Sequence, residues 1–168
     1  MKRAVAAVAL LTLFLPLLGA TPTSSFDAGS VHVDQYGSGA PALVLIPGLT
    51  DSGAVWATTV ARYQGAHTIY VLTLPGFGNR PMVAAPMLDA VARDIAAFLR
   101  RANKPVLIGH SLGGFLAIRL AEEHSNLIRG AIAAITFLKA RSLRLHDERI
   151  ARSPFFFTAW DYTEAKME

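Results

Sequence analysis

Apolar positions along the chain follow two patterns, short β-like runs and longer runs at helical spacing. Residues 43–46 (Leu-Val-Leu-Ile) form a continuous apolar run, as expected of a strand covered on both faces. Residues 88–101 place their apolar side chains on one helical face and their charged ones elsewhere. The full pattern predicts strands at 31–36, 43–46, 68–74, 105–108 and 128–138, and helices from Asp51 or Ser52 to about 63, at 88–101 and at 111–124.

Alternation of strands and helices indicates an α/β fold with a mainly parallel sheet and helices on both faces. Residues 31–36 are expected to form an edge strand. Beyond residue 139 the periodicity degrades and no further β-helix unit is legible. We therefore predict a partial α/β domain over 31–138 and an irregular tail over 139–168.

The N-terminal residues have the layout of a secretory signal peptide. A basic start at Lys2 and Arg3 precedes an apolar stretch over 4–18, and small residues at 19–20 offer a cleavage site. The stretch has about 15 residues, whereas a membrane span needs roughly 20. We predict a signal peptide over 1–20, a linker over 21–30, a secreted or periplasmic location and no stable membrane span after cleavage. An uncleaved N-terminal anchor is the alternative.

Composition narrows the function classes. The chain has no cysteine, which excludes disulfides and thiolate metal sites. Its net charge of +4 includes two charges that signal cleavage would remove, and no basic face with interleaved aromatics is visible, so no nucleic-acid partner is expected. No phosphate loop, metal-ligand cluster or cofactor motif appears, so neither a metal nor a cofactor is predicted.

The stretch Gly109-His110-Ser111-Leu112-Gly113 has the pattern G-x-S-x-G between a predicted strand and a predicted helix. A serine at such a sharp turn is lifted clear of the sheet, and close approach of strand and helix requires glycine two positions either side. Ser111 is therefore predicted to be a nucleophile, with Gly109 and Gly113 shaping the turn. A plain glycine-rich turn is the alternative. His110 is expected to point away from the serine and to serve packing or hydrogen bonding.

Three segments resemble landmarks of the serine-nucleophile α/β-hydrolases in the expected order: 43–56 (LVLIPGLTDSGAVW), 72–81 (LTLPGFGNRP) and 108–114 (IGHSLGG). The resemblance covers about residues 31–134, the N-terminal half of that fold. It implies an oxyanion hole from the backbone amides of Leu49 and Leu112, with Gly48 in the first loop. Proline at position 47 replaces the histidine that the family often carries there. A simple tight turn is the alternative for Gly48.

A serine at the elbow, rather than the aspartate of some relatives, suits acyl transfer to water through an acyl-enzyme. The resemblance thus implies hydrolysis of a small-molecule carboxylic ester, thioester or lactone. Two alternatives stay open: a non-catalytic exported binding domain that keeps the pocket, and a module completed by a partner chain that supplies the histidine. Trp56 is expected either to line the site or to anchor its helix in the core.

The family's triad order is serine, acid, histidine, and this chain offers no matching pair. His124 ends the helix that Ser111 begins, nearly 20 Å away at about 1.5 Å per residue. His146 lies in the tail, and Asp161 follows it in the wrong order. The acid and the base are therefore unassigned. We hypothesise a truncated or frameshifted product beyond about residue 134, with impaired turnover and self-association through an open sheet edge.

Overall fold

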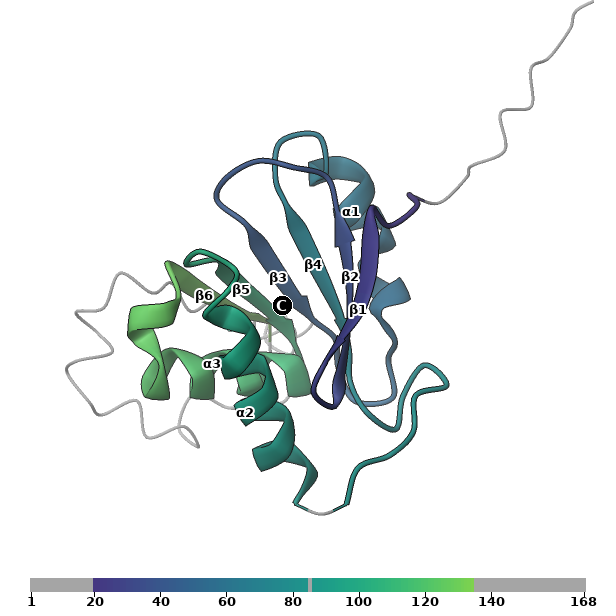
Figure 1. Cartoon of the computed structure of the whole chain (residues 1–168), viewed down its shortest axis with the longest axis vertical. Coiled ribbons are helices and arrows are strands. Elements are labelled where there is room, and N and C mark those ends of the chain that lie inside the picture. The colour runs from purple at the N-terminus through teal and green to yellow at the C-terminus, as the bar shows by residue number, and fades with distance from the viewer. Residues whose placement is uncertain (1–19, 85, 135–168) are drawn as a thin grey trace, which may run out of the picture.

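The computed structural model describes residues 20–84 and 86–134, which form one sheet with helices packed against it (Figure 1). Within these residues the sheet has six strands in the order β1-β2-β4-β3-β5-β6. The strands are β1 Ser24–Ala28, β2 Val31–Tyr36, β3 Leu43–Ile46, β4 Ile69–Thr73, β5 Val106–His110 and β6 Gly130–Ala134. The helices are η1 Gly53–Trp56, α1 Ala57–Tyr63, α2 Met87–Leu99, α3 Leu112–Glu123 and η2 Ser125–Leu127.

Four of these strands, β4, β3, β5 and β6, run parallel to one another, and β1 and β2 add an antiparallel end. Parallel neighbours need crossover connections, and α1, α2 and α3 lie in the connections from β3 to β4, β4 to β5 and β5 to β6. The prediction of a mainly parallel α/β sheet is confirmed.

The strand β3 shows why the sheet is covered on both faces. Val44 and Ile46 belong to the larger core, which α2 and α3 cover. Leu45 points to the opposite face and packs with Val60 of α1 and Ile69 of β4. These three of the four β3 side chains have no exposed surface, so the continuous apolar run reflects burial on both sides. Figure 1 shows α2 and α3 side by side on one face of the sheet.

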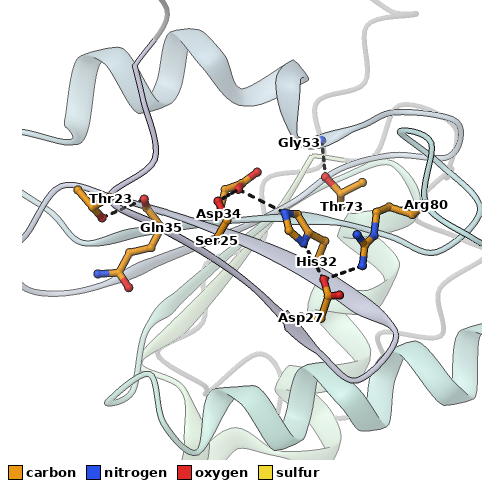
Figure 2. Close-up of polar contacts among 9 residues, drawn as sticks. All are labelled: Thr23, Ser25, Asp27, His32, Asp34, Gln35, Gly53, Thr73 and Arg80. Atoms are coloured by element: carbon orange, nitrogen blue, oxygen red, sulfur yellow. Dashed lines mark hydrogen bonds and ion pairs between the residues drawn. The ribbon is translucent and has the colours of Figure 1, made fainter.

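The strand β1 departs from the sequence prediction. It lies within the predicted linker 21–30, and it displaces β2 from the sheet edge that we expected β2 to occupy. Its residues are mostly exposed, so hydrophobic periodicity could not reveal it. Cross-strand polar contacts hold it instead (Figure 2): the Thr23 hydroxyl donates to the Gln35 carbonyl at 3.0 Å and the Ser25 hydroxyl donates to the Asp34 carboxylate.

An ion-pair cluster fastens the β1–β2 hairpin to the loop after β4. The Arg80 guanidinium donates to Asp27 at 2.6 Å, and His32 Nδ1 lies 2.7 Å from the same carboxylate oxygen (Figure 2). The hydrogen bond from Arg80, followed by that from His32, holds the pKa of Asp27 below its usual value. Both contacts are solvent-exposed, so they orient the loop more than they stabilise the fold.

One buried hydrogen bond anchors the segment that follows β3. The Gly53 N–H donates to Thr73 Oγ1 at 3.0 Å (Figure 2), and Thr73 is 7% exposed at the end of β4. Ser52 caps η1, its hydroxyl accepting from the Ala54 N–H at 3.3 Å. The predicted start at Asp51 or Ser52 is thus confirmed, with Ser52 as the cap.

The remaining predicted elements are present, and most of their ends lie one or two residues from the predicted positions. The predicted last strand is observed as Gly130–Ala134, and its continuation lies outside the described residues. The signal peptide and the tail also fall there, apart from Ala20, and stay predictions. No helix within the described residues is long and apolar enough to cross a membrane.

We predict that Thr73→Val destabilises the protein by about 1–3 kcal/mol, because it leaves the part-buried Gly53 N–H without an acceptor. Urea unfolding followed by circular dichroism measures the loss. Thr58→Val on α1 makes the same chemical change at an exposed position and should shift stability by less than about 0.5 kcal/mol. Equal midpoints for both variants would show that the bond does not anchor η1.

Candidate active site

Ser111 occupies the single-residue bend between β5 and α3. Its backbone angles are φ 51° and ψ −115°, a left-handed conformation that is strained for any residue with a side chain. The residue is half-buried, and its hydroxyl makes no capping hydrogen bond to α3. The structure therefore places Ser111 at a strained strand-to-helix turn, as the motif predicts; its role as a nucleophile stays a prediction.

The two motif glycines make this turn possible. A Cβ on Gly109 would collide with the backbone of Gly113, the second residue of α3. A Cβ on Gly113 would collide with the Ile46 carbonyl, at the end of β3. Both contacts involve backbone, which cannot rotate away as a side chain can. The two glycines of the motif are thus required by two close backbone contacts on either side of Ser111.

The loop after β3 lies directly beside Ser111. A Cβ on Gly48 would stand 3.3 Å from Ser111 Cβ, 3.1 Å from His110 Nδ1 and 3.0 Å from Asp51 Oδ2. The Asp51 N–H donates to the Gly48 carbonyl at 3.3 Å, closing a turn with Thr50 at φ 67°. Gly48 therefore forms a tight turn close to Ser111, and its part in an oxyanion hole stays a prediction.

Two backbone amides are available near the elbow. Leu112 is the first residue of α3, where N–H groups have no acceptor within the helix. Leu49 follows Gly48 at the tip of the turn and is 59% exposed. In the described part of the chain neither amide takes part in a hydrogen bond. The structure thus leaves both predicted oxyanion donors free, and their role stays a prediction.

The elbow is also fixed from its other side. The Ser111 N–H donates to the Ala134 carbonyl of β6 at 2.8 Å, and the Ser111 carbonyl accepts from the Gly114 N–H at 2.9 Å. Both backbone groups of the strained residue are therefore satisfied. The Ser111 side chain, by contrast, makes no capping hydrogen bond within the described residues.

His110 and Asp51 form a contact that sequence reasoning missed. His110 Nδ1 lies 3.7 Å from Asp51 Oδ2 and has no hydrogen-bond partner among the described residues, although this atom is buried. We had considered Asp51 only as a helix cap, a role that Ser52 fills. Asp51 lies in the loop after β3 and His110 at the end of β5, so the two side chains meet only because β3 pairs with β5. No local sequence pattern reveals this pairing.

The other candidate residues that the structure describes have no contact with Ser111. His124 follows the last residue of α3, at the far end of the helix that Ser111 precedes, as predicted. Trp56 packs against the cluster around Leu45 and Val60, which is the core-anchor interpretation. His146 and Asp161 lie outside the described residues, so the acid and the base stay unassigned. The described residues contain no group of three or more His, Cys, Asp or Glu that could hold a metal ion.

Comparison with known proteins identifies the family. The family model described as "Alpha/beta hydrolase family" matches residues 43–166, most of the chain. The chain belongs to this family. The match continues past the described residues, into the segment predicted to be an irregular tail.

Individual relatives match part of this chain. A pimeloyl-[acyl-carrier protein] methyl ester esterase of Aeromonas hydrophila is 36% identical over 105 residues, 61% of this chain and 40% of that protein. Lipase LipV of Mycobacterium tuberculosis is 37% identical over 144 residues, 82% of this chain and 53% of that protein. The chain thus spans about half the length, or less, of these curated relatives.

A solved structure of an E-2-(acetamidomethylene)succinate hydrolase superposes with a TM-score of 0.61 at 24% identity, covering 77% of this chain and 50% of that one. At this identity the likeness shows the fold alone. It agrees with the sheet order and the strand–elbow–helix unit described above.

We predict that Gly113→Ala destabilises the protein by about 3 kcal/mol or prevents cooperative folding, since the methyl group meets the β3 backbone. Gly65→Ala is the matched control: no atom lies within 4 Å of the added carbon, and its stability should change by less than about 0.5 kcal/mol. Urea midpoints compare the two. A Gly113→Ala protein as stable as the control would contradict the close approach of α3 to β3.

Proposed function

We propose that this protein is an exported serine hydrolase that cleaves a carboxylic ester, thioester or lactone through an acyl-enzyme on Ser111. The observation that carries the proposal is the strained backbone of Ser111 between β5 and α3, with amides at Leu49 and Leu112 that have no acceptor among the described residues. The names of the curated relatives, an esterase and a lipase, support the ester class.

The chemistry follows from this geometry. Ser111 Oγ attacks the carbonyl carbon, its proton passes to a base, and the carbonyl oxygen becomes an oxyanion. Amides aimed at that oxygen, together with the positive end of α3, stabilise the developing negative charge. The tetrahedral intermediate then breaks the C–O or C–S bond, and the departing alkoxide or thiolate takes up the proton that the base received; with a lactone, the resulting hydroxyl stays attached to the acyl chain. Water releases the acid from the acyl-enzyme by the same sequence.

The base is the part of the mechanism that the described residues leave open. No histidine among them hydrogen-bonds to Ser111. The proposal therefore places the base in a part of the protein outside residues 20–134. The same observation favours the second candidate, a non-catalytic exported binding domain that keeps the elbow and its loop.

A fluorophosphonate probe separates the two, because it labels only an activated hydroxyl. We predict that the full chain is labelled, that Ser111→Ala abolishes labelling, and that Ser125→Ala, an exposed serine in η2, leaves it unchanged. In-gel fluorescence or intact mass measures the extent. A chain that unfolds cooperatively yet takes up no label would reject the hydrolase proposal and favour the binding domain.

Export makes a separate prediction. Cleavage after Ala20 leaves the first described pairing intact, since the Thr23 N–H donates to the Gln35 carbonyl at 2.7 Å and β1 begins at Ser24. We predict a mature N-terminus at Thr21 in periplasmic or culture fractions of a bacterial host. Edman sequencing or peptide mass mapping reads it. An N-terminus at Met1 in the membrane fraction would instead support the uncleaved anchor.

A further inference from the structure

A cavity of about 380 Å³ lies between α2 and α3, on the sheet face opposite α1. Its lining is apolar except at one end: Leu88, Leu112, Phe115, Leu116 and Arg119. The volume falls within the range of small-molecule sites, roughly 300–1,000 Å³. We call this cavity the α2–α3 groove.

One residue that lines the groove is the sequence neighbour of Ser111. Leu112 lines it and is the next residue after Ser111, at the first position of α3. Leu88 lies in the first turn of α2. Helices that follow parallel strands start at the carboxyl edge of the sheet. The elbow and the N-terminal ends of α2 and α3, the two groove helices, thus share one edge of the sheet.

Exposure of the lining shows where a ligand would contact it. Leu116 is 2% exposed, whereas Leu88 and Phe115 are 42% and 43% exposed. An apolar ligand that covered these exposed side chains would remove their apolar surface from water, which favours binding. The groove thus offers apolar contact along its length.

The charged end of the groove is already neutralised. Arg119 donates to Asp89 at 2.7 Å and to Glu123 at 2.8 Å, and these hydrogen bonds, Asp89's first, raise the pKa of its guanidinium. With two carboxylates on one guanidinium, this end does not attract an anion. The ligand that suits the groove is therefore an uncharged alkyl chain.

We infer that the α2–α3 groove receives the alkyl chain of the acyl part of the substrate; the inference rests on the proposed function and deepens it. The acyl part is the chosen occupant because it alone stays bonded to Ser111 in the acyl-enzyme, next in the sequence to Leu112, which lines the groove. Each methylene buried contributes about 0.8 kcal/mol, about a fourfold gain in rate per methylene. The substrate class is an ester of a medium-chain aliphatic acid.

Alkyl fluorophosphonates that differ only in the chain on phosphorus (ethyl, butyl, octyl) test the inference on the full chain. We predict that the labelling rate of Ser111 rises with chain length, by at least tenfold from ethyl to octyl. Leu88→Gln should lower the octyl-to-ethyl rate ratio at least tenfold. Tyr63→Gln, at an equally exposed position on α1, should keep the wild-type ratio. Equal rates for all chains, or equal ratios in both variants, would overturn the inference.

A binding measurement separates failure of the inference from failure of the proposed function. Ser111→Ala protein cannot form the covalent bond, so binding of methyl octanoate, read from the NMR signals of Leu88 and Phe115, tests the groove without catalysis. We predict shifts at both residues and tighter binding than for octyl acetate, whose chain lies on the alcohol side. If no fluorophosphonate labels the wild type while methyl octanoate still binds here, only the hydrolase proposal falls.

Three results of the binding measurement would overturn the acyl assignment. The first is an absence of shifts at Leu88 and Phe115. The second is equal or tighter binding of octyl acetate, which would place the alcohol chain in the groove. The third is a set of shifts that grows with protein concentration without ligand, which would assign the groove to a second copy of the chain.

Discussion

The close approach of α3 to the sheet is the constraint on which the site depends. Gly113 at the start of α3 touches the end of β3, and Gly109 at the end of β5 touches Gly113. Two backbones can come this near only where no Cβ intervenes. The residue between them has no room for an ordinary turn and adopts φ 51°. Strain at Ser111 is thus a consequence of packing on both sides of it, and the packing maintains it.

The order of the strands turns this local constraint into a site. β3 lies between β4 and β5, so the loop that leaves β3 runs beside the elbow at the end of β5. Gly48 in that loop approaches Ser111 closely enough that a Cβ would meet the serine's own Cβ at 3.3 Å. The hydrogen bond between Gly53 and Thr73 then fixes the far end of the loop to β4. Neighbouring strands thereby bring together residues that are about 60 positions apart in the sequence.

Sequence reasoning found what periodicity and glycine spacing encode. The apolar run of β3 and the helical face of α2 identified buried elements, and G-x-S-x-G identified the bend at Ser111. It missed β1, whose residues are exposed and whose pairing with β2 is carried by the ladder and by contacts such as Ser25 to Asp34. It also missed the facing of Asp51 and His110, because that contact exists only once β3 and β5 pair. Local patterns predict elements; contacts between elements follow from the pairing.

The strand β6, the last strand of the described sheet, supports the backbone of Ser111. Its last described residue, Ala134, accepts the Ser111 N–H at 2.8 Å, so the strained serine is tied to the strand that ends the described sheet. An N–H left without an acceptor at this bend would weaken the strained conformation, since an unsatisfied backbone donor costs about 1–3 kcal/mol when buried. Alanines at positions 131 and 133 are buried beneath α3, which holds β6 against β5. The packing of α3 therefore supports Ser111 twice, directly through Gly113 and indirectly through β6.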